Sequence, residues 1–368
     1  MYYNLDDFFS FGLTNNLYDS QKLENNHNLN SSPLIMGKKV DLDKAILKIK
    51  NLINEKKSPH FDGLICDQKS IDSVFNLAEK TRASINHYEN DEINNFYSAY
   101  QKYGSYLVSF NELKNRSDLL VVIGNFEESL LSKFIKKLGW SKRKIKEEIF
   151  LFSKKNTQTI EKKIKIKEIE FSGNFLSNFF NNNKKNKKLE TLQEKIKSSK
   201  YPVIVINPKN GFLYSQNILK SLEYINNNFR ILRLFRLSGL NNSSGFVLSS
   251  VSKTGYPNAI NFTDWGPIYD PFMYNAIYQK SFKDVQIFFS NLSHKPKITK
   301  FKRNIFIGHP NFSAREKVDV FVPVKTPGID MDGVIVRSDG ASLMKLPKKI
   351  ESNYMEISQI INLLIARE

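Results

Sequence analysis

Few side chains in this sequence combine the residue type and the spacing that a chemical site requires. The 368 residues contain one cysteine, Cys66, and five histidines, among them His87 in the segment Asn86-His87-Tyr88. Thiolate and imidazole groups bind transition metals, so these two residues are the first candidates for a metal site. Cys66 ends an apolar run, which is typical of a small buried side chain, and a lone histidine is more often a loop residue. Both interpretations favour structural roles.

The remaining histidines have no metal-binding spacing. No HxH or HxxxH pair occurs among them, so the sequence gives no support for a zinc site. They are His27, His60, His294 and His309.

The densest carboxylate group lies in a glycine-containing stretch near the C-terminal end. Asp330, Asp332 and Asp339 fall within ten residues of one another. Aspartate and glycine are common turn residues, so we expect these carboxylates to shape turns, and an acid/base pair is the alternative.

Two glycine-containing segments are candidates for phosphate contacts. Gly124-Asn125 follows an apolar strand pattern, and Ser243-Ser244-Gly245 precedes an apolar stretch. The sequence lacks GxxxxGK[ST], GxSxG and a strand-linked GxGxxG, so neither segment has a phosphate-loop signature. Ordinary strand-end turns explain both segments equally well, and the two interpretations stay open.

The net charge of +18 raises the possibility of a nucleic-acid partner. Only ten of the 55 basic residues are arginine, whereas proteins that recognise nucleic acid rely on arginine for bidentate contacts. The charge is concentrated in residues 133–200, which carry 20 basic and 7 acidic side chains. A lysine-rich solvated surface is the favoured interpretation, and a basic protein that binds nucleic acid or a polyanionic cofactor is an alternative.

No signal for export or membrane insertion is visible. The sequence has no run of about 18 apolar residues, and its acidic start lacks a basic segment and a cleavage site. A single cysteine excludes an internal disulfide. We therefore expect a cytoplasmic protein that does not contact a membrane.

Hydrophobic periodicity predicts short strands that alternate with helices. Helices are expected over 41–53, 70–80, 128–138 and 216–226, and Asp41 is an N-cap candidate. Strands are expected over 61–66, 118–124, 148–152, 164–169, 202–207, 230–234, 285–289, 304–307, 318–324 and 333–337. Residues 174–188 are rich in Asn and Lys and predict a linker. This alternation predicts an α/β fold with largely parallel sheets, and the length predicts two units.

The stretch VDVFVPVKTPGIDMDGVIVRSDGASLMKLP, residues 318–347, adds a resemblance to a known family. It resembles the C-terminal signature of the B subunit of formylmethanofuran dehydrogenase, and still more that of the bacterial formyltransferase/hydrolase complex. Both belong to the molybdopterin oxidoreductase superfamily. Three further landmarks come in family order: residues 110–124 (FNELKNRSDLLVVIG), 252–257 (SKTGYP) and 265–271 (WGPIYDP).

The resemblance implies a specific architecture. Relatives contain two doubly wound, Rossmann-like domains of the formate dehydrogenase type, one inserted into the other. Transferred to this sequence, residues 36–80 and 200–368 form one discontinuous α/β domain, residues 81–199 form the inserted domain, and residues 1–35 are a vestigial arm.

The cysteines that serve catalytic relatives are missing here. Relatives bind an iron–sulfur cluster through an N-terminal cysteine run and bind tungsten or molybdenum through one further cysteine. The corresponding positions hold Phe8, Phe11 and Asn15, and the metal-binding loop falls near Ile85-Asn86-His87-Tyr88. One cysteine cannot provide about four thiolates, so we assign no catalytic, cofactor-binding or metal-binding residue and expect no cofactor.

The resemblance therefore implies a non-redox, structural B subunit. Its expected partners are the hydrolase, formyltransferase and C subunits of a cytoplasmic complex, without nucleic acid. That complex oxidises one-carbon units linked to tetrahydromethanopterin and releases formate. An active molybdopterin or tungstopterin dehydrogenase is the main alternative, and the basic polyanion-binding protein is the second.

Overall fold

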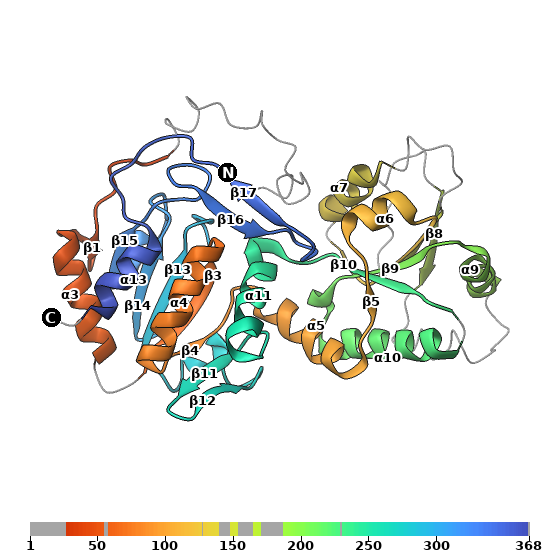
Figure 1. Ribbon diagram of the computed structural model, residues 1–368, viewed down its shortest axis with the longest axis horizontal. Helices are drawn as coiled ribbons and strands as arrows, with labels where there is room; N and C mark the ends of the chain where they lie inside the picture. Colours follow the sequence, from red (N-terminus) through yellow and green to blue (C-terminus); the bar gives the residue numbers. More distant parts are fainter. Residues whose placement is uncertain are drawn as a thin grey trace. The chain divides into compact units, whose positions relative to one another are not determined.

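The computed structural model describes residues 27–54, 58–126, 128–139, 148–153, 165–170, 187–228 and 230–366. The chain divides into two compact units (Figure 1). Unit 1 comprises Met1–Asn90 and Gly239–Glu368, and unit 2 comprises Asp91–Ser238. The family resemblance instead implied that the discontinuous domain resumes at residue 200, whereas unit 1 resumes at Gly239. Residues 202–236 pair within the second sheet, because their strands extend its parallel hydrogen bonding.

Unit 1 contains a nine-stranded sheet, here called sheet A, in the order β12-β11-β4-β3-β13-β14-β15-β1-β2. Its five central strands, β4-β3-β13-β14-β15, are parallel, and antiparallel strands extend both edges. The strands are β1 Leu34–Ile35, β2 Lys38–Lys39, β3 His60–Ile65, β4 Ser84–Ile85, β11 Ile260–Thr263, β12 Gly266–Tyr269, β13 Val285–Ser290, β14 Arg303–Gly308 and β15 Val320–Pro323. A separate hairpin joins β16 Gly333–Val336 to β17 Leu343–Leu346.

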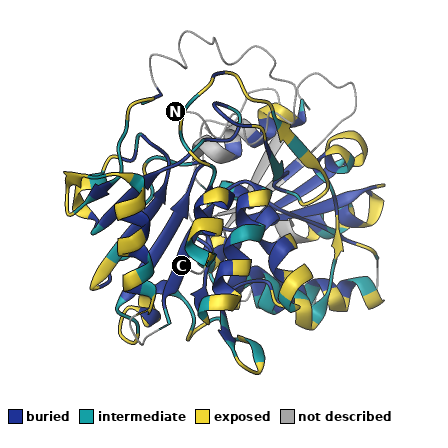
Figure 2. Ribbon diagram, turned by 60° about the vertical axis from the view of Figure 1, so that its left-hand side comes forward, coloured by how far each residue is buried: buried dark blue, intermediate teal, exposed yellow. Residues whose placement is uncertain are grey.

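The core of unit 1 lies against the central strands. β3 and β13 are buried along their whole length, as expected for parallel strands covered on both faces, and they are dark in Figure 2. Helix α4 packs against α13 and α11, and α13 also packs against α3. The helices are α3 Leu42–Asn54, α4 Gln68–Thr81, α11 Ser243–Thr254, α12 Ala276–Gln279 and α13 Ile357–Ile365, with short turns η3 Leu240–Asn242 and η4 Arg315–Lys317.

Unit 2 contains a six-stranded parallel sheet, here called sheet B, in the order β5-β10-β9-β6-β7-β8. The strands are β5 Tyr106–Leu107, β6 Leu119–Ile123, β7 Glu148–Ser153, β8 Lys165–Glu170, β9 Pro202–Ile206 and β10 Arg233–Arg236. The helices are α5 Asn90–Tyr103, α6 Phe110–Arg116, α7 Glu128–Leu138, α9 Lys187–Ser198 and α10 Phe212–Asn228, with the turn η2 Pro208–Asn210.

The predicted α/β fold with parallel sheets is confirmed, and each predicted helix and strand has a counterpart at nearly the predicted place. Turns lie near Pro327-Gly328 and at Gly340. Gly328 and Gly340 have φ values of +76° and +74°, in the region that favours glycine. The doubly wound arrangement of the domains stays a prediction.

Candidate functional site

Sheet A has a topological switch point between β3 and β13. The strand that follows β3 in the chain, β4, lies on one side of β3. The later parallel strands β13, β14 and β15 lie on its other side. In open α/β sheets, ligands bind in the crevice beyond the carboxyl ends of the strands at such a point. The residues that follow β3 and β13 are therefore the natural place to look for a site.

Cys66 and Asp67 follow β3 directly and are both buried. Burial raises the pKa of the Cys66 thiol well above its ordinary value, so the thiol stays protonated. The Asp67 carboxylate accepts hydrogen bonds from Ser70 Oγ at 2.5 Å and from Asn291 Nδ2, just beyond β13, at 2.8 Å. The pKa of Asp67 is raised above its ordinary value, because the effect of burial outweighs that of these two donors, which lower it. The ends of the two strands are thus tied to each other.

Asn242 links the end of β3 to the β16 hairpin. Its Nδ2 donates to the Cys66 carbonyl oxygen at 2.8 Å, and its Oδ1 accepts from the Val336 amide at 2.9 Å. Asn242 has a φ of +57°, a left-handed conformation that asparagine tolerates better than most residues. The side chain occupies the space just beyond β3.

The segment Ser243-Ser244-Gly245, a phosphate candidate in the sequence, forms the first turn of α11 and contacts protein groups. Ser244 Oγ donates to the Ser338 carbonyl at 2.7 Å, and Gln68 Nε2 donates to the Gly245 carbonyl at 3.2 Å. A Cβ atom at Gly245 would clash with Asn242 Oδ1, so this glycine is required for close packing.

These residues do not fit a pterin–metal group. The thiol of Cys66 is buried and protonated, and Asn242, Gln68 and the start of α11 fill the space at the switch point. A ligand there would have to displace several buried hydrogen bonds. At the switch point of unit 1, these polar groups bond to the chain itself.

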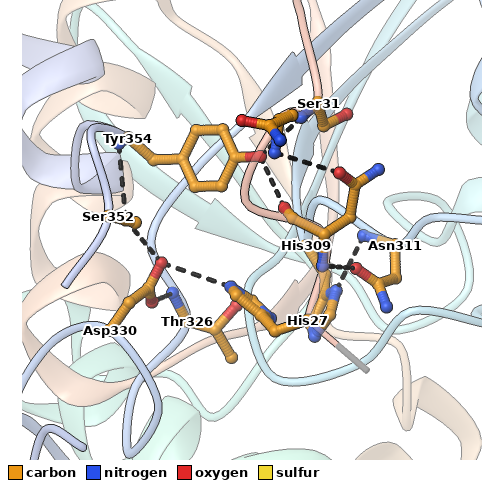
Figure 3. Close-up of polar contacts among 10 residues, drawn as sticks. His27, Ser31, His309, Asn311, Thr326, Asp330, Ser352 and Tyr354 are labelled. Carbon is orange, nitrogen blue, oxygen red and sulfur yellow. Dashed lines mark hydrogen bonds and ion pairs between the residues drawn. The ribbon is translucent and has the colours of Figure 1, made fainter. Parts of the chain in front are cut away.

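A cluster of histidines and one carboxylate lies nearby, beyond the ends of β14 and β15 (Figure 3). Asp330 is fully buried; His27 Nε2 lies 3.3 Å from its Oδ2, which also accepts from Ser352 Oγ at 2.7 Å. The ring centroids of His27 and His309 are 5.4 Å apart, and those of His309 and His294 are 5.5 Å apart. Three histidines that show no metal-binding spacing in the sequence are therefore neighbours in the fold.

The same cluster fastens the segment that begins at His27. The Tyr354 hydroxyl donates to the Asn28 carbonyl at 2.5 Å and accepts from the Ser31 amide at 2.7 Å. The Asn28 amide donates to Asn311 Oδ1 at 2.8 Å. These contacts could not be predicted from a sequence pattern, because His27 and Asp330 are 303 positions apart. Within the described part of the chain, no three His, Cys, Asp or Glu residues are placed to hold a metal ion.

The three aspartates singled out from the sequence do not act together. Asp332 is exposed and accepts from the Lys348 amide at 2.8 Å. Asp339 forms a two-point ion pair with Arg337, with bonds of 2.8 and 2.7 Å, and accepts from the Ala341 amide. Asp330 belongs to the histidine cluster. Asp332 and Asp339 stabilise local backbone or a single partner, as expected for turn residues, whereas Asp330 also binds groups distant in the sequence.

His87 lies in the core of unit 1 rather than in an open loop. Its Nδ1 accepts from the Glu89 amide at 3.0 Å, and its ring lies against Phe246. Burial lowers the pKa of His87 to about 3, so the ring is neutral at physiological pH. His60 is also buried with a pKa of about 3, and its Nδ1 lies 2.8 Å from Ser84 Oγ.

The second phosphate candidate, Gly124-Asn125, lies at the switch point of sheet B, between β6 and β9. Asn207 Nδ2 donates to the Asn125 carbonyl at 2.9 Å, and the Asn125 amide donates to Asn210 Oδ1 at 3.1 Å. Gly124 has a φ of +99°, and a Cβ there would lie 2.7 Å from the Tyr214 hydroxyl. The polar groups of this turn therefore bond to other parts of the chain.

Some sequence predictions fall outside the described residues. Phe8, Phe11 and Asn15, the positions that correspond to cluster ligands in relatives, are among them, as is most of the predicted linker 174–188. In the described residues, no helix has the length and apolar character needed to cross a bilayer.

Comparison with known proteins gives matches at the level of structure. No family model and no curated protein sequence matches this chain. The crystal structure of the formyltransferase/hydrolase complex from Methylorubrum extorquens, determined with methylofuran, contains a chain that matches with a TM-score of 0.79 and 16% identity. The match covers 90% of this chain and 97% of that chain.

A second match is more distant. Acetylene hydratase from Pelobacter acetylenicus matches with a TM-score of 0.59 and 13% identity, over 94% of this chain and 62% of that one. At these identities the matches establish a shared fold. A chain of a multi-subunit one-carbon complex and a larger enzyme thus share the architecture described above.

Proposed function

We propose that this chain is a non-redox structural component, equivalent to the B subunit, of a formyltransferase/hydrolase complex. One observation carries the proposal: the fold matches nearly the whole length of a chain from such a complex, while at the switch point of unit 1 Asn242 bonds to the Cys66 carbonyl and Gln68 bonds to the first turn of α11. A shared fold does not fix function. We therefore base the distinction between a structural subunit and an active oxidoreductase on the residues at the switch point.

The chain's own residues support a structural role. A cluster of the iron–sulfur type needs about four thiolates, and this chain contains one cysteine. That cysteine is buried and hydrogen-bonded through its carbonyl to Asn242. An active molybdopterin or tungstopterin dehydrogenase is the less favoured function for this reason.

The proposed partners follow from the type of complex. They are a hydrolase, a formyltransferase and a C-type subunit, and the reaction releases formate from a one-carbon unit that tetrahydromethanopterin delivers. In this arrangement the present chain holds its partners in place and supplies no catalytic group. We place the complex in the cytoplasm.

Purification of the tagged chain from the cells that encode it tests the proposal. Mass spectrometry should identify the hydrolase and formyltransferase subunits at fixed stoichiometry, and metal analysis should find no stoichiometric iron, molybdenum or tungsten in this subunit. A Cys66→Ala chain is the matched control and should recover the same partners. Stoichiometric iron with molybdenum or tungsten would instead support the oxidoreductase alternative. Nucleic acid that is released by salt would support the basic binding protein.

A further inference from the structure

Unit 1 presents a concentrated apolar surface along the β11–β12 hairpin and helix α12, here called the hairpin face (residues 256–283). Trp265 in the hairpin turn is 98% exposed. Seven exposed large apolar side chains fall between residues 265 and 282, a third of all such side chains among the described residues: Trp265, Ile268, Phe272, Met273, Ile277, Tyr278 and Phe282. Clustered exposed apolar side chains mark sites of protein interaction, whereas single ones are ordinary.

The backbone of the hairpin face is held in one conformation. The Asp270 carboxylate accepts from the Phe272 and Met273 amides at 2.8 and 2.9 Å. Asn275 caps α12 by accepting from the Tyr278 amide at 3.0 Å. Gln279 ties the helix to the sheet, because its Oε1 accepts from Ser84 Oγ at 3.0 Å. A surface that is already ordered loses little conformational entropy on binding.

A pocket of about 440 Å³ opens among these side chains, and Lys283 lies in its wall beside Met273 and Phe282. The Lys283 ammonium donates to Ser58 Oγ at 2.9 Å, to Asn261 Oδ1 at 3.3 Å and to the Pro59 carbonyl at 3.4 Å. All three acceptors are neutral, and no carboxylate of the described residues forms an ion pair with Lys283. Burial without a compensating charge lowers the pKa of Lys283 to about 8.

Charge decides what can cover this face. A half-buried cation without a counter-ion attracts a carboxylate, and covering it with an apolar group alone would leave a buried unpaired charge. Both carboxylates of the hairpin face already have partners on their own chain: Asp264 pairs with Arg82, and Asp270 accepts from the amides of its own turn. A second copy placed face to face could compensate the ammonium group only by giving up one of these contacts.

We propose that the hairpin face is a docking surface for a different protein chain, whose carboxylate enters the pocket beside Lys283 while its apolar side chains cover Trp265, Phe272 and Phe282. Aromatic side chains around a buried charged contact are typical of the centres of protein interfaces. That the partner is a hydrolase or formyltransferase subunit rests on the proposed function. The surface itself rests only on the observations above.

Site-specific photo-crosslinking tests the surface. The photoreactive residue p-benzoylphenylalanine replaces Trp265 in the full chain, expressed in the cells that encode it. The matched control carries the same residue at Leu213, which is also exposed but lies on α10 in unit 2. Position 265 should give one defined crosslinked chain, different from this one, and position 213 should not. The crosslinked peptide should contain apolar residues next to Asp, Glu or a carboxyl terminus.

Variants of Lys283 test the carboxylate. Lys283→Met should lower the crosslink yield at position 265 at least fivefold, whereas Lys283→Arg should keep more than half of it, because the charge remains. Phe272→Ser should also lower the yield, and Leu213→Ser, its matched control, should not. Melting temperatures of all variants establish that the chain is folded.

The outcomes separate the surface from the proposed function. A crosslinked hydrolase or formyltransferase subunit supports both, and a crosslinked chain of another kind with the stated peptide supports the surface and refutes the proposed function. A crosslink to a second copy of this chain, equal yields at positions 213 and 265, or no crosslink at position 265 would overturn the docking surface. An unchanged yield with Lys283→Met would overturn the carboxylate contact.

Discussion

Asn242 donates a hydrogen bond to the carbonyl oxygen of Cys66, although the two residues are 176 positions apart in the sequence. The same side chain accepts from the Val336 amide, so one asparagine joins the end of β3, the start of α11 and β16. Buried backbone groups that lose a partner cost free energy, and here two of them depend on one side chain. This link lies at the switch point of sheet A.

Replacement of Asn242 should destabilise unit 1. Asn242→Gly removes both hydrogen bonds but tolerates the φ of +57°, and we expect it to lower the free energy of unfolding by about 2–4 kcal/mol. Asn242→Ala should cost about 1 kcal/mol more, because alanine resists a left-handed conformation. Urea denaturation followed by circular dichroism measures both. Equal stability of wild type and the glycine variant would show that the link contributes nothing.

The buried carboxylate of Asp330 should be far more important than that of Asp332. Asp330 accepts from Ser352 Oγ and the Thr326 amide and lies against His27, so Asp330→Ala leaves buried donors unsatisfied. We expect a loss of about 3–5 kcal/mol. Asp332→Ala is the matched control; its carboxylate is exposed, and the loss should stay below about 1 kcal/mol. Similar losses for the two variants in thermal denaturation would contradict the assignment.

Hydrophobic periodicity predicted the parallel core most clearly in sheet B, because its central strands β6 and β9 are short, continuous apolar runs. Strand β6, Leu119–Ile123, and strand β9, Pro202–Ile206, are buried at every position. Helix α5 was missed because its buried side includes Glu92 and Asn94, so its sequence resembles a polar loop. Periodicity also cannot say which strands pair. The direct pairing of β9 with β6 moved residues 202–236 into unit 2.

The candidate site was predictable only in part. The lone cysteine and the glycine turns are visible in the sequence, and so is their lack of motif spacing. The hydrogen bonds at the switch point are not visible in the sequence, because they join residues such as Gln68 and Gly245, which are 177 positions apart. The histidine cluster needs the fold for the same reason. His309 follows β14, whereas His27 precedes β1, and only the sheet brings them together.

The stability of the chain should fall in acid, with opposite contributions from two kinds of buried group. His60 and His87 have pKa values of about 3 when folded, so between pH 6.5 and 3 only the unfolded state binds their protons, and each favours unfolding as the pH falls. Asp62 has its pKa raised by burial to about 6, so between pH 6 and 3.8 the folded state binds its proton and gains stability. Asp62 therefore offsets one histidine.

Single variants separate these contributions. From pH 6 to 4, His87→Gln should make the free energy of unfolding less dependent on pH by about 1.4 kcal/mol per pH unit, relative to wild type. Asp62→Asn should increase the dependence by the same amount. Urea denaturation at several pH values gives the slopes. Parallel curves for the wild type and both variants would show that these groups do not titrate as the burial implies.

Cys66 should be chemically silent in the folded chain. Its thiol is buried and protonated, so it should react with Ellman's reagent at least tenfold more slowly in native protein than in guanidinium chloride. Cys66→Ala removes one sulfur atom from the core and should lower the free energy of unfolding by about 1–2 kcal/mol. In the proposed complex, formyl transfer and formate release should then change less than about twofold, because no catalytic interaction is lost. The two rates are compared between wild-type and Cys66→Ala complexes that are assembled to the same extent. A loss above about a hundredfold in an intact complex would reveal a catalytic site in this chain, since Cys66 is its only possible thiolate ligand.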